Sequence, residues 1–464
     1  MVFRDLRAFL QHLEDQGELR RVQAEVDPKY EIGAICRILN EKHGPAVLFE
    51  AVKGSTVPVA AQLLASQRRV ALALNSTVEN VFDECVRRLS TPRPPRRVSR
   101  GACQEVVHEA EDVDLGLLPI CTNNPDDGGP YITAGHVICR DPEFGWNLAI
   151  YRMMFHSRNS AFLRLSPAHH GYEFYRNAEK RGETKMEFAV AIGVDPSIYI
   201  ASQFVPSLGV YEMDIAGALR GEPVEVVPCR TVDLEVPAEA EVILEGEVSI
   251  PPDTGDEGPF GEFCGYTTSL IRGEKVMKIK AITHREDAIY HNIWLGRPIH
   301  EHLYINALTY ALSAYFDLRA KYPAVKACYA PPACVSQTLV VQIEERLKRP
   351  GLINNLMAAA LNTRGGLWKH VIAVDEDVKV FNLDEVEWAI TTRFQADRDL
   401  FTIPRCYTSR LDPSASPEGV TAKMFIDATK KPGFWGDGGR APTRNDGVCC
   451  PTLGRVWLGH IVSS

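Results

Sequence analysis

Hydrophobic residues in the N-terminal part of the chain recur at helical and strand spacings. Leu6, Phe9, Leu10 and Leu13 lie on one face of a predicted helix, which Gly17 ends. Further periodic segments predict a strand at 22–26, a helix at 32–39, a strand at 45–49 and a helix at 81–89. The proline- and arginine-rich segment that follows, 91–100, is typical of an exposed linker. These elements predict a small α/β domain.

From about residue 115 the pattern changes to strands separated by turns. Asp126–Pro130 and Asp141–Gly145 are rich in turn residues. The predicted strands are 132–139, 146–155, 188–194, 242–250 and 276–283. This succession predicts an antiparallel barrel with a few inserted helices.

After residue 301 the chain becomes helical and then alternates strands with helices. Strands are predicted at 339–343 and 371–374, with a helix at 352–361 between them, so a third, α/β domain is expected. The tail after Lys431 is rich in Gly, Pro and Arg and shows little periodicity. The fold class is therefore predicted to be α/β (α+β). The expected domains are 1–114, 115–310 and 311–464.

Composition narrows the class of protein. The net charge of -9 argues against nucleic-acid binding, and 45% hydrophobic with 24% charged residues is ordinary for a globular protein. No apolar run approaches the ~18 residues that span a bilayer, and no signal-peptide pattern is visible. The twelve cysteines form no C-x2-C pair, which indicates reduced thiols. We therefore predict a cytoplasmic protein without nucleic-acid or membrane partners.

Candidate chemistry begins with the segment Asp256–Glu262 (DEGPFGE). Glu257 and Glu262 flank Gly-Pro-Phe-Gly, in which Pro259 and the glycines favour a tight turn. Two carboxylates held together raise each other's pKa, as an acid/base pair requires. Two solvated loop glutamates are the alternative interpretation.

A second group of polar residues could bind a metal ion. Asn147 and Arg152 lie five positions apart on one predicted strand and so on opposite faces. His169 and His170 follow a strand, and Glu212 precedes a predicted helix. Asn, His and Glu together suit a divalent ion that also holds a phosphate. Hydrogen-bonded histidines and a glutamate complementing a helix dipole remain alternatives.

Two further patterns leave their roles open. Arg398 could clamp an anion or pair with Asp397 and Asp399. His300 and His302 have metal-like spacing, but no third ligand is evident from the sequence.

Several motifs in a fixed order resemble the UbiD family of decarboxylases, which use prenylated FMN. The similarity runs from Phe3 to about Lys431. It rests on FRDLRAFLQHLEDQGEL, GPAVLFEAVKG, DGGPYITAGH to GWNLAIYR, DEGPFGEFCGY, EWAITTRFQADRDL and GVTAKMFIDATKK. The resemblance implies an N-terminal α/β domain, a split β-barrel flavin-binding domain and a C-terminal α/β domain that mediates oligomerisation, as a homodimer or homohexamer.

The resemblance also implies roles for individual residues. Arg152, Glu257 and Glu262 match the family's catalytic Glu-Arg-Glu network, in which Arg152 keeps Glu257 ionised and Glu262 donates the proton. The implied ligands of a Mn2+ (or Mg2+) ion at the flavin phosphate, with K+ nearby, are Asn147, His169 (or His170) and Glu212. The implied cofactor-binding residues also include Thr133, Ile150, Ser202, Gln203 and Arg398.

The implied function is reversible, non-oxidative decarboxylation of an aromatic, heteroaromatic or α,β-unsaturated carboxylic acid. In the family, prenylated FMN reacts by cycloaddition and a glutamic acid protonates the carbon that loses CO2; a flavin prenyltransferase supplies the cofactor. We hypothesise an aromatic or heteroaromatic substrate from the polar residues His291, Asn292, His300, His302 and Asn306. A flavin-dependent oxidoreductase and a non-catalytic subunit of a multi-subunit carboxylase are the alternatives.

Overall fold

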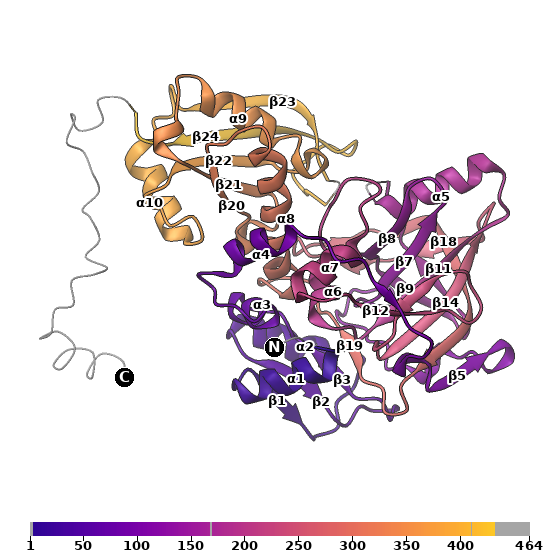
Figure 1. Cartoon of the computed structure of the whole chain (residues 1–464). Coiled ribbons are helices and arrows are strands. Elements are labelled where there is room, and N and C mark those ends of the chain that lie inside the picture. The colour runs from indigo at the N-terminus through magenta and orange to yellow at the C-terminus, as the bar shows by residue number, and fades with distance from the viewer. Residues whose placement is uncertain (1–2, 168, 410, 432–464) are drawn as a thin grey trace, which may run out of the picture.

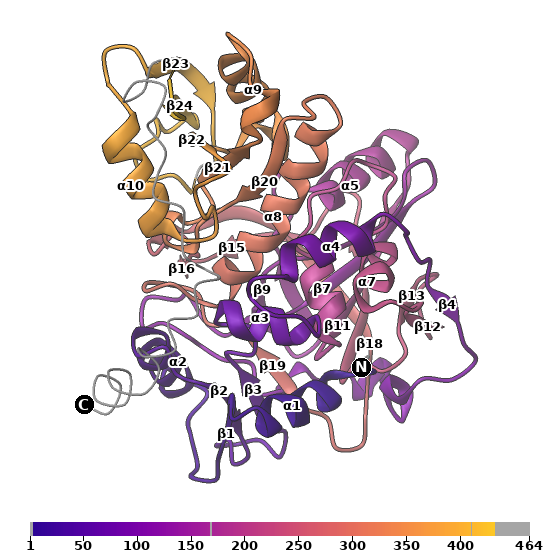
Figure 2. The ribbon, with the colours of Figure 1, turned by 60° about the vertical axis from the view of Figure 1, so that its left-hand side comes forward.

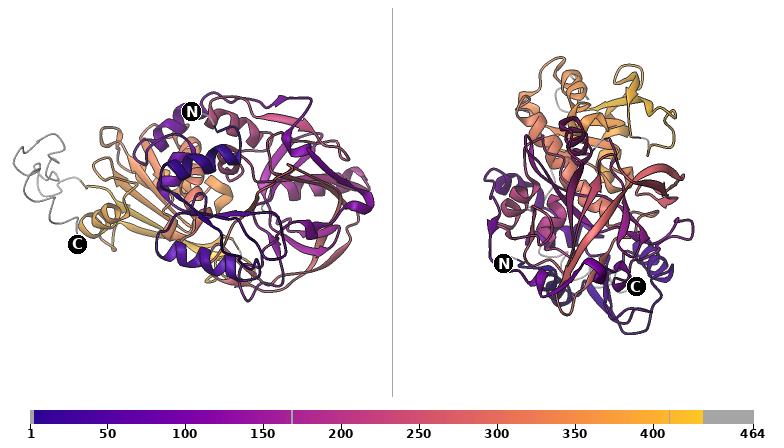
Figure 3. Two further views of the ribbon diagram at one scale, coloured as in Figure 1. Left: turned by 90° about the horizontal axis from the view of Figure 1, so that it is seen from below. Right: turned by 90° about the vertical axis from the view of Figure 1, so that its right-hand side faces the viewer.

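A computed structural model describes residues 3–431 except 168 and 410. In Figure 1 the C-terminal sheet lies at the upper left, the N-terminal sheet lies below it and the central sheet lies to the right; Figure 3 gives two further views. The predicted tail after Lys431 lies outside the described residues.

The N-terminal part is a four-stranded sheet covered by helices. Its strands lie in the order β1-β2-β3-β19, with bounds Leu19–Val22, Ala46–Phe49, Val59–Ala61 and Tyr290–Asn292. Its helices are α1 (Leu6–Asp15), α2 (Glu31–Glu41), α3 (Gln67–Ala73) and α4 (Val81–Leu89). Helix α1 buries the four residues predicted from its periodicity, Leu6, Phe9, Leu10 and Leu13. The amphipathic pattern thus identified the face that packs on the sheet.

The central part is a ten-stranded sheet in which neighbouring described strands pair antiparallel. Its order is β6-β9-β10-β18-β14-β11-β7-β8, and β5 and β15 also pair with β18. The bounds are β5 Val106–Glu109, β6 Tyr131–Ile132, β7 His136–Asp141, β8 Gly145–Ile150, β9 Met153–Ser157, β10 Ser160–Leu163, β11 Lys185–Ile192, β14 Val242–Ser249, β15 Thr254–Glu257 and β18 Ile271–His284. The pairing path has β6 and β8 as its two ends, so the hydrogen bonding among the described residues leaves the expected barrel open.

Shorter elements flank this sheet. The helices are α5 (His170–Arg181), α6 (Pro196–Ala201) and α7 (Glu212–Arg220). A small sheet joins β13 (Glu235–Pro237), β12 (Glu225–Pro228) and β4 (Arg96–Arg97), and β16 (Phe260–Gly261) pairs with β17 (Thr267–Thr268). The predicted linker therefore contributes a short strand, β4, to the central part.

The C-terminal part is a five-stranded sheet with helices. Its order is β20-β21-β22-β24-β23, with bounds Val325–Tyr329, Thr338–Ile343, His370–Asp375, Val420–Ala428 and Leu400–Tyr407. The helices are α8 (Glu301–Arg319), α9 (Leu352–Ala360) and α10 (Leu383–Arg393). Helix α8 contacts α3, α4, α6 and β20, so it links all three parts of the chain (Figure 2).

Several local predictions were wrong at the residue level, and the strand expected over 132–139 is interrupted between β6 and β7. The strand expected over 146–155 is two strands, β8 and β9, with Arg152 in the link between them. The alternation at 22–26 does not extend a strand, because β1 already ends at Val22. Glu212 is the first residue of α7 rather than preceding it. Each error reflects a chain reversal or boundary that short-range periodicity does not encode.

Within the part of the chain that the structure describes, no helix is long and apolar enough to cross a membrane.

Candidate active site

The segment predicted to carry acid/base chemistry is a sharp link between two strands. Strand β15 ends at Glu257, and β16 begins at Phe260. Gly258 has φ +101°, a backbone angle that glycine adopts readily, and the Gly258–Pro259 peptide bond is cis. The link places Glu257 and Glu262 on the same side, where both contact Arg152.

Arg152 bridges the two carboxylates. Its Nε donates to Oε1 of Glu257 at 2.9 Å and its Nη2 to Oε2 at 2.8 Å, a two-point contact. Its Nη1 donates to Oε1 of Glu262. Arg152 lies in the link between β8 and β9 and not on a strand. The expectation that Arg152 and Asn147 lie on opposite faces of one strand therefore does not apply.

Burial sets the protonation behaviour of this triad. The side chain of Glu257 is fully buried, and those of Arg152 and Glu262 are 11% and 9% exposed. Burial is the largest cause that raises the pKa of Glu262; Arg152 opposes it, and Glu257 raises it further. Burial lowers the pKa of Arg152, but the two carboxylates outweigh it and raise that pKa overall. The triad thus combines a fixed cation with a carboxyl group whose pKa is raised by burial.

Two aromatic residues that the sequence did not single out hold the triad. The hydroxyl of Tyr131 donates to Oε1 of Glu257 at 2.9 Å. The guanidinium carbon of Arg152 lies 4.6 Å from the centroid of the Phe260 ring, and the Tyr131 and Phe260 rings pack 4.4 Å apart. Phe260, the first residue of β16, therefore supports Arg152 between Glu257 and Glu262.

The Asp126–Pro130 turn docks on the back of this link. The backbone N–H of Gly128 donates to the carbonyl of Pro259 at 2.7 Å, and a Cβ at Gly128 would lie 2.1 Å from the carbonyl oxygen of Gly258. Oδ1 of Asp127 accepts from the N–H of Gly261 at 2.8 Å. The turn was predicted, but its contact with a segment about 130 residues away carries no short-range signal.

A second polar group lies where β8 meets α7 and α5. The side-chain amide of Asn147 donates to Glu212 at 3.0 Å, and the N–H of Leu148 donates to the same carboxyl at 2.8 Å. The hydroxyl of Tyr151 donates to Oδ1 of Asn147 at 2.9 Å, and the Tyr151 ring stacks on His169 with centroids 4.6 Å apart. The fold thus brings the three expected metal ligands together around Tyr151.

The two histidines differ in their positions. His169 caps the start of α5, and its Nδ1 accepts from the N–H of Ser166 at 3.3 Å. His170 is the first residue of that helix. Burial lowers the pKa of His169 to about 4, so its imidazole is neutral at neutral pH, as a metal ligand requires. Burial also raises the pKa of Glu212 to about 8.

No cluster of three or more His, Cys, Asp and Glu side chains in the described ranges is arranged to hold a metal ion. The expected set contains only two such residues, His169 and Glu212, because its third member is the amide Asn147.

The other expected cofactor residues lie on neighbouring elements. Ile150 ends β8, and Ser202 follows α6 with its hydroxyl 3.2 Å from Nδ1 of His136. Gln203 is buried next to it. The hydroxyl of Thr133 donates to Asn292 at 3.2 Å and so ties the β6–β7 connection to β19.

Among the described residues, no hydrogen bond or ion pair joins Arg398 to the other expected cofactor-binding residues. Its side chain is 60% exposed and pairs with Asp399 at 3.3 Å, the pairing considered as an alternative from the sequence. It lines a hollow with Asn354, Asn355 and Asp427, all in the C-terminal part.

The polar residues behind the aromatic-substrate hypothesis are largely internal rather than at the surface. His291, Asn292, His300 and Asn306 are at most 1% exposed. His300 lies 3.2 Å from the carbonyl oxygen of Phe263, and Asn306 donates to Ser336 at 3.2 Å. Burial lowers the pKa of His300 to about 4, so this imidazole is neutral.

Three family profiles match consecutive parts of the chain. They describe the N-terminal, Rift-related and C-terminal domains of 3-octaprenyl-4-hydroxybenzoate carboxy-lyase and match residues 10–89, 96–298 and 303–428. The chain therefore belongs to the UbiD family, as its motifs predicted. A relative from Archaeoglobus fulgidus, described as an uncharacterized protein, is 36% identical over 95% of this chain and 94% of its own.

Solved structures with the same fold are UbiD-class enzymes. HmfF from Pelotomaculum thermopropionicum, in complex with FMN, is 37% identical, with a TM-score of 0.85 over 94% of this chain and 97% of its own. Vanillic acid decarboxylase of Sedimentibacter hydroxybenzoicus in its closed form is 33% identical, with a TM-score of 0.86 over 95% and 94%. The apo 3,4-dihydroxybenzoic acid decarboxylase AroY of Klebsiella pneumoniae is 29% identical, with a TM-score of 0.83 over 95% and 97%.

Proposed function

We propose that this protein is a prenylated-FMN-dependent carboxy-lyase of aromatic or heteroaromatic carboxylic acids. The observation that carries the proposal is the buried Glu257–Arg152–Glu262 bridge, in which one arginine contacts both carboxylates. Family membership and the decarboxylase relatives support the reaction class. Removal of CO2 leaves a carbon that needs a proton, and a buried carboxyl group can supply one.

In this proposal the three residues have separate tasks. Arg152 and the hydroxyl of Tyr131 hold the carboxyl group of Glu257 in place through three hydrogen bonds. Glu262 makes a single contact with Arg152, and its raised pKa favours the protonated form that can donate. When bound, prenylated FMN supplies the electron acceptor for the bond that releases CO2. The chain's own residues position the reactants and return the proton.

The Asn147–Glu212 group suits a cation. Glu212 is 2% exposed, and its hydrogen bonds come from the neutral amide of Asn147 and the N–H of Leu148. A buried carboxylate with neutral donors is stabilised by a positive ion. Asn147, His169 and Glu212 would hold Mn2+ or Mg2+ at the flavin phosphate, with K+ nearby. Thr133, Ile150, Ser202 and Gln203 would contact the flavin.

The deciding experiment measures the cofactor and the product together. The protein is co-expressed with a flavin prenyltransferase and supplied with Mn2+. We expect prenylated FMN by mass and visible spectrum, close to one per chain, and CO2 release from at least one member of a panel of aromatic and heteroaromatic acids. Turnover of acyclic enoic acids alone would refute the aromatic assignment.

Two other outcomes would overturn the proposal. Plain FMN with NAD(P)H-linked turnover and no CO2 release would identify a flavin-dependent oxidoreductase. A loaded protein that releases CO2 only when partner subunits are added would identify a subunit of a multi-subunit carboxylase.

The role of Arg398 is tested separately through cofactor retention. As a phosphate contact, Arg398→Ala should lower the flavin occupancy of the purified protein, whereas unchanged occupancy would leave Arg398 as a partner of Asp399 alone.

A further inference from the structure

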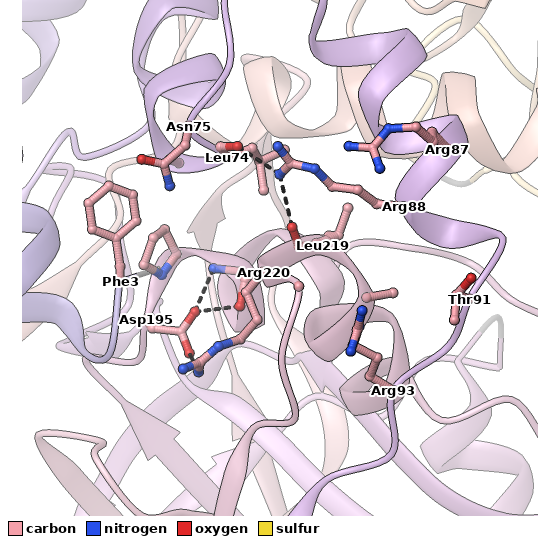
Figure 4. Close-up of a pocket in the computed structure, with 15 residues that line it drawn as sticks. Phe3, Leu74, Asn75, Arg87, Arg88, Thr91, Arg93, Asp195, Leu219 and Arg220 are labelled. Atoms are coloured by element: carbon pink, nitrogen blue, oxygen red, sulfur yellow. Dashed lines mark hydrogen bonds and ion pairs between the residues drawn. The ribbon is translucent and has the colours of Figure 1, made fainter. Parts of the chain in front are cut away.

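A cavity of about 380 Å³ lies where the N-terminal helices, the linker and the central helices meet. Four of the residues that line it are arginines, Arg87, Arg88, Arg93 and Arg220, and one is an acid, Asp195. The whole chain carries a net charge of -9, so this concentration of cations runs against the general charge of the protein. Figure 4 shows these side chains gathered around one hollow.

The cavity is distinct from the candidate active site. Helix α7 begins at Glu212, in the proposed metal group, and its last residues, Leu219 and Arg220, line the cavity. Nine helical residues span roughly 13 Å, which separates the two places along this helix. Helix α6 likewise has Asp195 at its cavity end and Ser202 at the other.

Two of the arginines serve the architecture. Arg88 donates to the carbonyls of Leu74 and Leu219 at 2.7 and 2.9 Å and pairs with Glu84. The carboxylate of Glu84 therefore balances the charge of Arg88. The hydrogen bonds of Arg88, which lies on α4, connect that helix to the end of α3 and to α7.

Arg220 is 9% exposed and fixed by two acids. It pairs with Asp195 at 3.1 Å and with Glu222 at 2.9 Å. Its Nε is buried without a hydrogen-bond partner among the described residues, so one of its donors is left over. An unpaired buried donor is costly unless a ligand or water completes it.

Arg87 and Arg93 account for the excess charge. Both are exposed, and the ion pairs found in the described part of the chain include neither. Arg87 lies in the last turn of α4, where the helix dipole stabilises a positive charge, and this explains its place on the helix. It does not explain why Arg93, from the linker, faces the same hollow (Figure 4). Two unmatched guanidinium groups at one cavity favour a multivalent anion.

We propose that this cavity binds a small multivalent oxyanion, a phosphoryl or polycarboxylate group, through Arg87 and Arg93, with Arg88 and Arg220 as fixed positive walls. The planar fork of guanidinium donors matches the oxygens of both groups. The volume admits an anion of the size of pyrophosphate or citrate and not a whole dinucleotide. The inference does not depend on the proposed decarboxylation.

The test is calorimetric titration of the FMN-loaded protein with inorganic phosphate, pyrophosphate and citrate. FMN occupies the phosphate site that the proposed function assigns, so that site does not contribute. We expect saturable binding that weakens about tenfold or more in the Arg87→Ser/Arg93→Ser variant, because two charged contacts are lost. Preference for pyrophosphate over citrate would identify a phosphoryl ligand, and the reverse a polycarboxylate.

Arg100→Ser is the matched control. Arg100 is an exposed arginine in the same linker and does not line the cavity, so its replacement should leave the affinity unchanged. Because Arg87 and Arg93 are exposed, the double variant should melt at the wild-type temperature without anion. Equal affinity of the double variant and the wild type, or no saturable binding of any of the three anions, would overturn the proposal.

Discussion

Among single residues, Arg152 determines the character of the candidate site, because one guanidinium group contacts both acids of the DEGPFGE segment. The sequence indicated that these acids would meet in a turn and raise each other's pKa. In the structure, burial is the largest cause of the raised pKa of Glu262, and the second acid contributes less. The environment of a carboxyl group therefore matters more than its spacing from another.

Glu262→Gln should lower kcat by roughly 100-fold or more, because a general acid is removed while the side-chain volume is kept. Flavin content, measured by absorbance, should stay at the wild-type value. Glu241→Gln is the control: Glu241 is also a buried, arginine-paired carboxylate but belongs to a different cluster. Near-normal CO2 release in the Glu262 variant would assign the proton to another group.

The pH dependence follows from the raised pKa of Glu262. The acid must be protonated to donate, so kcat should be constant at low pH and fall as the pH rises through that pKa. Because the pKa lies above the ordinary value, the fall begins at higher pH than for an exposed glutamate. The measurement is the kcat profile from acidic to alkaline pH, and a profile that rises with pH would contradict the donor role.

At the scale of elements, the candidate site is a contact between two turns. The Asp126–Pro130 turn and the β15–β16 link approach so closely that Gly128 has no room for a side chain. Asp127, 9% exposed, caps the link by accepting from the N–H of Gly261. The approach fixes the link that joins Glu257, at the end of β15, to Glu262, just after β16.

Gly128→Ala should therefore displace the β15–β16 link and reduce kcat by about tenfold or more, since small displacements of catalytic groups are costly. The neighbouring Gly129→Ala is a matched control. Its Cβ would meet only the flexible end of Met154, at 3.3 Å, whereas at Gly128 it would meet backbone oxygen at 2.1 Å. Similar activities for the two variants would show that the close approach does not position the acids.

In the whole molecule, strands and ion pairs join parts that are far apart in sequence. Strand β19 pairs with β3 in the N-terminal sheet, and β5 pairs with β18 in the central one. Helix α1 is tied to the central sheet by Arg7, which donates to both carboxylate oxygens of Glu241 at 2.8 and 2.9 Å. The parts therefore stabilise one another.

Arg7→Ala should destabilise the whole chain by about 1–3 kcal/mol, because the buried carboxylate of Glu241 loses its two-point ion pair and keeps the N–H of Ile289 at 3.0 Å and a longer contact to Arg285 at 3.6 Å. Arg4→Ala is the control: its side chain is 71% exposed and pairs with Glu239, so its effect should stay below about 1 kcal/mol. Urea unfolding measures both. Equal effects would show that Arg7 does not join the two parts.

The sequence by itself determined the order of α/β, β-rich and α/β segments, the buried face of α1 and the family, because these depend on local periodicity and on motifs in a fixed order. It also identified the two acids and the arginine as candidates. Only the tertiary structure decided that Arg152 leaves the strand to bridge them, that Tyr131 and Asp127 support them, and that Arg93 meets Arg87 at a cavity. These are contacts between segments distant in the chain, and the free energy that selects them comes from burial and charge pairing in three dimensions.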